Sequence, residues 1–99
     1  MGISVVLRNE RGDDIHRLKV PYVDPVASWV PSAYPLLSGI DPDGNTIFNA
    51  RQMQQMLPEV EGLLATNLAE EERESVAGVA SLCLEGQRPP HRYLWFLGD

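Results

Sequence analysis

His91-Arg92-Tyr93-Leu94-Trp95-Phe96-Leu97-Gly98-Asp99 closes the sequence and decides its fold. The five large apolar residues 93–97 are typical of a strand that is buried on both faces of a sheet. Side chains alternate along a strand, so Tyr93 and Trp95 should face one way and Leu94 and Phe96 the other. A chain terminus is usually polar and frayed unless something holds it in place. We therefore expect the chain to end within its own sheet.

Four further strands are predicted upstream, in two hairpins. Residues 3–9 are rich in β-branched side chains, and the glycine and acidic residues of 9–14 predict a turn into a return strand at 15–20. In the second hairpin, strands at 36–40 and 45–48 flank the sequence Asp41-Pro42-Asp43-Gly44, which has the residue preferences of a type I turn.

Residues 21–35 connect the two predicted hairpins and contain four prolines, two tyrosines and one tryptophan. The prolines forbid a continuous helix, and the aromatic residues argue against a disordered linker. We expect a wrapped loop with a short helical turn at 26–30 that packs Trp29 onto the body of the protein. Such a loop is a natural place for a binding surface.

A helix is predicted directly after the second hairpin. Asn49 followed by Gln52 three residues later fits a capping box. Apolar residues then recur at helical spacing over 53–64. Pro58 interrupts this pattern, which predicts a kink or a restart of the helix at that point.

A second helix is expected to begin near Asn67, where a capping-type spacing to Glu70 recurs, and to end at Gly86. The predicted order ββββααβ indicates an α+β fold. We expect one domain spanning residues 1–99, in which a mostly antiparallel sheet of about five strands has two helices packed on one face.

The net charge of the chain indicates which kinds of partner it can attract. Fourteen acidic and eight basic side chains give a net charge of −6. Such a field repels the phosphate backbone of nucleic acids and favours a basic protein partner. No apolar run approaches the roughly 18 residues that cross a bilayer, and residues 1–7 lack the basic segment of a secretory signal, so we expect none. The single cysteine, Cys83, suits a reducing compartment, so we expect a cytoplasmic protein with no membrane contact.

The sequence favours no metal or cofactor. Aligning the turn 41–45 with a calcium-binding loop puts Gly39 at the first ligand position and Ala50 at the last, and neither residue can supply the ligand needed there. A plain hairpin turn is the better interpretation. The side chains that could bind zinc through nitrogen or sulfur are His16, His91 and Cys83. Their spacing in the sequence is not that of a zinc site.

Catalytic patterns are also missing from the sequence. No serine lies in a nucleophile-elbow context, and neither histidine has an acidic residue nearby in sequence that would orient it. No glycine-rich loop of the kind that holds phosphate is present. The sequence therefore favours a non-catalytic protein over an enzyme.

Two candidate surfaces follow from these patterns. The first is a partner-binding surface of aromatic and acidic residues, namely Trp29, Tyr34, Asp41, Asp43, Glu70, Glu71 and Glu74. The alternative is a ligand-binding pocket of polar residues, namely Asp41, Asp43, Asn49, Gln52 and Asp99. The pocket requires the last two residues of the chain to curl next to the turn at 41–44.

Three segments, residues 2–7, 40–53 and 91–99, together resemble a family of small bacterial proteins with no assigned activity. In that family a stretch of the form D-x-x-G-[DN]-T-x-F-N-x-x-Q leads into a helix, and the chain closes on an apolar strand ending in Gly-Asp. The resemblance supports the predicted fold and supplies no function. Pro42-Asp43 departs from the aromatic residue and glycine expected in the turn.

Two functions from different classes remain open. The first is a non-catalytic, acidic protein-binding domain of the bacterial cytoplasm, such as an immunity or antitoxin-like protein that covers a basic effector. The second is a small enzyme or ligand-binding domain that uses the pocket around Asp41, Gln52 and Asp99. A homodimer formed through an edge strand is a further expectation.

Overall fold

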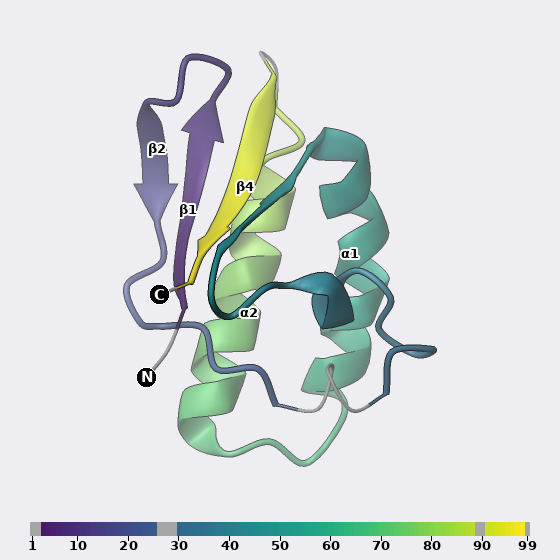
Figure 1. The fold of residues 1–99 in the computed structure, drawn as a ribbon. Helices are drawn as coiled ribbons and strands as arrows, with labels where there is room; N and C mark the ends of the chain where they lie inside the picture. The colour runs from purple at the N-terminus through teal and green to yellow at the C-terminus, as the bar shows by residue number, and fades with distance from the viewer. Residues whose placement is uncertain (1–2, 26–29, 89–90, 99) are drawn as a thin grey trace.

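The computed structural model describes residues 3–25, 30–88 and 91–98. One antiparallel sheet lies in front of two helices, which both cover the same face of it (Figure 1). The predicted α+β class is therefore confirmed, with four strands in place of about five. The elements are β1 (Ser4–Asn9), β2 (Asp14–Arg17), the 3-10 helix η1 (Leu37–Gly39), β3 (Asn45–Phe48), α1 (Ala50–Leu64), α2 (Glu70–Glu85) and β4 (Arg92–Leu97).

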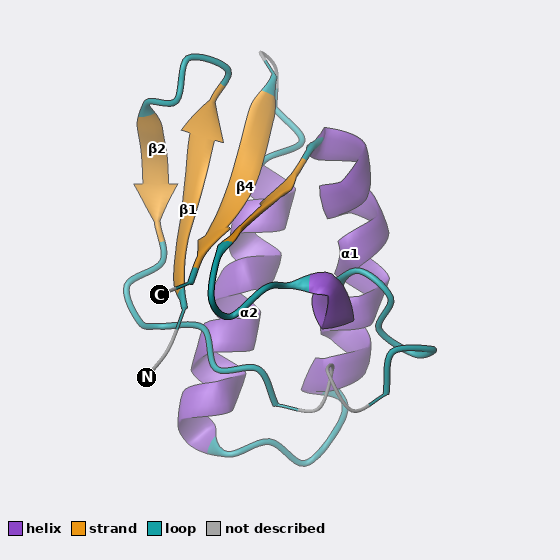
Figure 2. Ribbon diagram, viewed as in Figure 1, coloured by secondary structure: helices purple, strands orange, loops and turns teal. Residues whose placement is uncertain are grey.

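The last strand, β4, lies in the middle of the sheet, whose strand order is β2-β1-β4-β3. Its side chains Leu94 and Phe96 are fully buried against the helices, as the alternation of the sequence predicts. Tyr93 and Trp95, on the other face, are only half-buried. The prediction that this strand is buried on both faces is therefore wrong, because both helices cover the same face of the sheet (Figure 2).

Residues 36–40 do not form the predicted strand. They contain η1, and β3 pairs with β4 instead of with this segment. The cause lies on α1, where the buried carboxylate of Glu59 accepts hydrogen bonds from the backbone N–H groups of Leu36, at 3.1 Å, and Leu37, at 3.0 Å. Both N–H groups point at one carboxylate, which an extended strand would not allow because successive N–H groups in a strand point in opposite directions.

The return strand of the first hairpin is shorter than predicted. β2 ends at Arg17 rather than near residue 20. One more backbone bond follows, from the N–H of Leu18 to the carbonyl of Val5 at 2.9 Å. The chain then crosses below β1, where Tyr22 pairs with Ile3 in an isolated bridge. The predicted helical turn at 26–30 and its Trp29 lie outside the described residues, apart from Val30.

The start of α1 is the capping box that the sequence predicts. The Asn49 side chain accepts a hydrogen bond from the Gln52 backbone N–H, and the Gln52 side chain accepts one from the Asn49 N–H, each at 2.9 Å. The helix continues through Pro58 without a restart. Pro58 has no N–H, so the carbonyl of Gln54 lacks its helical hydrogen bond. Both residues are exposed, and water can donate to this carbonyl instead.

The helix α2 begins at Glu70, three residues later than predicted. The guanidinium of Arg73 donates hydrogen bonds to the carbonyls of Leu64 and Thr66, at 2.9 and 3.1 Å, and so holds the connection outside the helix. The Glu72 side chain accepts a hydrogen bond from the N–H of Ala69, the residue that precedes the helix. Gly86 follows the last helical residue, as predicted.

The core lies between the sheet and the helices. Phe96 stands edge-on to both Tyr22 and Phe48, with ring centroids 5.4 and 5.7 Å apart. Cys83 is fully buried beside Met56, where burial raises the pKa of its thiol to about 12, so it packs in the core as a small hydrophobic residue. No helix in the described ranges has the length and apolar character needed to cross a bilayer.

Candidate functional site

One face of the sheet is covered by neither α1 nor α2, the long helices of the described residues, and we call it the outer face (Figure 1). It carries the side chains that alternate with those packed against the helices, in rows that run across the strands. One row, set by the strand register, runs from Arg17 on β2 through Val6 and Trp95 to Ile47 on β3. Beside it, Arg8 on β1 lies opposite Tyr93 on β4.

A hollow of about 400 Å³ lies on the outer face where the β1–β2 hairpin meets β4. Its volume is within the usual range for a ligand or side-chain pocket. Ile47, at the rim, has 46% of its surface exposed. The hollow is lined by Asn9, Glu10, Arg11, Gly12, Ile47, Tyr93 and Trp95.

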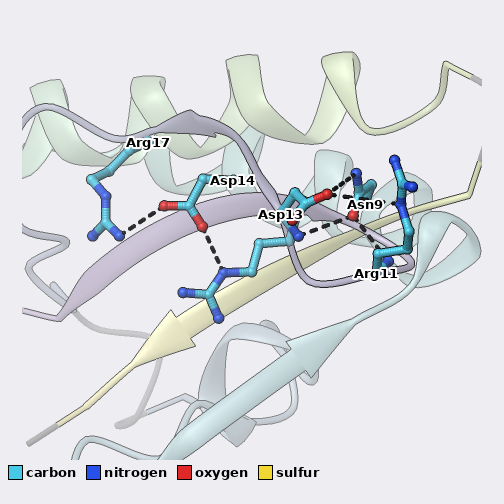
Figure 3. A network of polar contacts seen from close by, with 6 residues as sticks. Asn9, Arg11, Asp13, Asp14 and Arg17 are labelled. Atoms are coloured by element: carbon cyan, nitrogen blue, oxygen red, sulfur yellow. Dashed lines mark hydrogen bonds and ion pairs between the residues drawn. The ribbon is translucent and has the colours of Figure 1, made fainter.

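A network of charges holds one arginine on the indole ring of Trp95. The guanidinium carbon of Arg8 lies 4.8 Å from the ring centroid, within the range of a cation–π contact. Arg8 also donates a hydrogen bond to one oxygen of Asp14 at 2.9 Å, and Arg17 donates one to the other oxygen at 3.2 Å (Figure 3). These two bonds, first that from Arg8, hold the pKa of Asp14 below its usual value.

Replacing Asp14 with asparagine is expected to remove a pH-dependent part of the stability. The pKa of Asp14 is lowered in the folded chain. Its ion pairs therefore stabilise the fold above the unfolded-state value of about 3.9, and this contribution is lost as the pH falls below it. The wild type should be the more stable protein at pH 7, and the difference should shrink towards pH 3. Urea denaturation at both pH values measures this, and an unchanged difference would contradict it.

The tip of the hairpin is built on the side chain of Asn9. Its carbonyl oxygen accepts hydrogen bonds from the backbone N–H groups of Arg11, at 2.9 Å, and Asp13, at 3.0 Å, as Figure 3 shows. Gly12 has a φ of 89°, a conformation that favours glycine. Within the described ranges, the Glu10 carboxylate forms no hydrogen bond or ion pair. One wall of the hollow is thus a hydrogen-bonded turn that carries the unpaired carboxylate of Glu10 and also the cationic Arg11.

The predicted turn at 41–44 is present, since the Gly44 N–H donates to the Asp41 carbonyl at 3.4 Å, but it joins no hairpin because residues 36–40 form no strand. Asp41 also accepts a bond from the N–H of Asp43 at 2.9 Å, and both aspartates are exposed. The N–H of Gly98 donates to the Gly44 carbonyl at 2.8 Å, so the end of β4 does lie against the turn. Asp99 lies outside the described residues.

The described members of the predicted ligand pocket do not form one group. Asp41 and Asp43 precede Asn45, which pairs with Leu97 near the end of β4, whereas Asn49 and Gln52 follow the other end of β3. The four residues of β3 therefore separate the two pairs. The side chains of Asn49 and Gln52 are also occupied by the capping box.

The predicted partner-binding residues are divided among three parts of the molecule. Trp29 lies outside the described residues. Tyr34 is half-buried, and its ring lies against Gly62 of α1. Glu70, Glu71 and Glu74 are exposed at the start of α2, in the helix layer, and Asp41 and Asp43 lie on the turn. None of the described ones lines the hollow on the outer face.

The residues that the sequence analysis missed are Glu10, Ile47, Tyr93 and Trp95. For Tyr93 and Trp95, the alternation of apolar side chains along β4 could have indicated an outward position. Two helices in a two-layer fold cover only one face of a sheet. One of the two sets of apolar side chains in this strand must then face outward.

A second hollow, of about 510 Å³, lies between β2 and α2. Here His16 Nδ1 lies 2.8 Å from a carboxylate oxygen of Glu85, which is 69 residues away in the sequence. Ser81 lines the same hollow, but its hydroxyl donates to the Ala77 carbonyl at 3.4 Å, and no bond between Ser81 and His16 is found in the described residues. Within the same ranges, no three His, Cys, Asp or Glu side chains are grouped to hold a metal ion.

Comparison of the chain with protein-family models, curated proteins and solved structures finds no match. The resemblance of residues 2–7, 40–53 and 91–99 to a bacterial family gains no support from these comparisons. The function has to be inferred from the residues of this chain and their contacts.

Proposed function

We propose that this chain is a non-catalytic protein-binding domain whose outer face binds a basic protein. The observation that carries the proposal is the group formed by Trp95, Tyr93 and Ile47 around the hollow. Trp, Tyr and Arg are the residues that contribute most often to the energy of protein interfaces. This group is the aromatic part of the sheet face that the helices leave uncovered.

The net charge of the chain, rather than an excess of acidic groups on the outer face, favours a basic partner. On the outer face, Arg8 and Arg17 are paired with Asp14, and Arg11 lies 3.8 Å from Asp13. The net charge of −6 therefore arises mainly from other surfaces, among them the acidic turn and the start of α2. Such a field attracts a basic protein and speeds its association. An immunity or antitoxin-like role, in which the chain covers a basic effector, is the form of this function that we favour.

The hollow fits an arginine or lysine side chain of the partner. Its walls offer the rings of Tyr93 and Trp95 and the free carboxylate of Glu10. A cation placed between an aromatic face and a carboxylate gains both a cation–π contact and an ion pair. The chain already holds one guanidinium, that of Arg8, over the Trp95 ring.

Two charge-reversing variants test this proposal. Glu10→Arg and Glu74→Arg each raise the net charge by two, from −6 to −4, but only Glu10 lines the hollow. Calorimetric titration with a tetra-arginine amide peptide should show a dissociation constant about tenfold higher for Glu10→Arg, the equivalent of about 1.4 kcal/mol. Glu74→Arg should change it by less than about threefold, because it alters only long-range attraction.

Equal weakening by the two variants would show that the peptide responds to net charge alone and would contradict the proposed site. Stronger weakening by Glu74→Arg would move the site to the start of α2. Both exchanges replace an exposed side chain that forms no ion pair in the described residues. Circular dichroism of each variant checks that the fold is kept.

A further inference from the structure

The strand β3 forms one edge of the sheet and pairs only with β4. In the described part of the chain, no other backbone hydrogen bond involves residues 45–48. One row of N–H and C=O groups on this strand therefore lacks a backbone partner. An edge of this kind is a template for pairing with another strand.

The two edges of the sheet differ in how they are protected. The opposite edge strand, β2, carries Asp14, His16 and Arg17, and its pairing with β1 contains a register shift between Leu7 and Arg8. Charged side chains and bulges are the usual means of preventing association through an edge. β3 has the sequence Asn-Thr-Ile-Phe, without a charge, and Ile47 is 46% exposed. Its short length, four residues, limits how much pairing it can form.

We propose that two copies of the chain pair antiparallel through β3 about a two-fold axis and join their four-stranded sheets into one. The two-fold axis would place Ile47 opposite Ile47 of the second copy and Thr46 opposite Phe48, because residues opposite each other in antiparallel strands point to the same face of the sheet. Continued along the chain, this register brings the turn that contains Asp41 and Asp43 to the first turn of the second copy's α1.

The charges at the two ends of β3 are complementary under this symmetry. Asp41 and Asp43 precede the strand, and Arg51 follows it. All three are exposed, and none belongs to an ion pair in the described residues. An isologous contact needs such self-complementarity, because each surface meets its own copy. This is why we assign the edge to a second copy instead of to a different protein.

The expected dimer is weak. Four residues of strand and two sets of ion pairs form a small interface, and small interfaces give transient complexes. We expect a dissociation constant of the order of 10–100 µM. Sedimentation analysis from about 5 to 500 µM should then show the mass rise from 11.0 kDa towards twice that value.

Ile47→Lys tests the edge directly, because it brings two like charges together at the centre of the dimer. We expect this variant to stay monomeric over the whole concentration range. Leu84→Lys is the matched control, since Leu84 is 61% exposed on α2, away from β3, and we expect it to dimerise like the wild type. Circular dichroism shows whether each variant is folded.

A charge exchange tests the register. Arg51→Asp should raise the dissociation constant about tenfold, whereas the double variant Arg51→Asp with Asp43→Arg should restore it at the wild-type net charge. A wild type that is monomeric at 500 µM would overturn the proposal. So would association of folded Ile47→Lys at the wild-type strength, or a double variant no better than Arg51→Asp.

Discussion

Phe96→Ala is expected to lower the free energy of unfolding by about 3–5 kcal/mol, the cost of removing a buried phenyl ring from a core. Phe96 is fully buried in the central strand, and its ring contacts two other aromatic rings edge-on. A domain of this size is stable by about 5–15 kcal/mol in total. We therefore expect a large fall in the urea midpoint, or unfolding at low urea.

Two further variants serve as comparisons for Phe96→Ala, one that keeps most of the apolar volume and one at an exposed position. Phe96→Leu should cost less, about 1–1.5 kcal/mol, because it keeps much of the apolar volume. Leu84→Ala, at an exposed position, should change the stability by no more than about 0.5 kcal/mol. If Phe96→Ala were no more harmful than Leu84→Ala, the placement of Phe96 at the centre of the core would be wrong.

Glu59→Ala is expected to lower the free energy of unfolding by about 2–4 kcal/mol. The Glu59 carboxylate accepts the N–H groups of Leu36 and Leu37 at the start of η1, and Glu59 is only 9% exposed. Its removal leaves two N–H groups without an acceptor in a site with little access for water, and each such loss costs about 1–3 kcal/mol. Urea denaturation followed by circular dichroism measures the change.

Glu59→Gln removes the negative charge of the side chain but keeps nearly its size, so it measures the effect of the charge at nearly constant shape. Glutamine fills nearly the same volume but offers one acceptor oxygen in place of two, so we expect a smaller loss, about 1–2 kcal/mol. A matched surface variant, Glu61→Ala on the exposed face of α1, should be nearly neutral. A Glu59→Ala protein as stable as Glu61→Ala would show that the carboxylate does not hold η1.

Local sequence patterns predicted much of the fold. The alternation of apolar residues in 93–97 located β4, and Asn49 with Gln52 located the start of α1, because both signals depend on neighbours in the chain. The segment 36–40 could not be predicted in the same way. Its conformation depends on Glu59, more than 20 residues away in the sequence, and no local pattern reveals that contact.

The candidate site was predicted less well, for a similar reason. The sequence placed Trp95 and Tyr93 in the sheet correctly. Their apolar character, however, indicated that the outer face would be buried as well as the face that carries Leu94 and Phe96. Which face stays open depends on where α1 and α2 pack. The hollow also needs Glu10 from the hairpin beside Tyr93 from the last strand, which only the pairing of β1 with β4 brings together.

The most direct test of the central claim is a map of where a basic ligand binds. Titration of ¹⁵N-labelled protein with tetra-arginine amide should shift the amide signals of Ile47, Tyr93, Trp95 and residues 9–12, together with the indole N–H signal of Trp95. Shifts confined to Glu70–Glu74 of α2 or to the turn at 41–44, with the outer face unchanged, would contradict the proposed function.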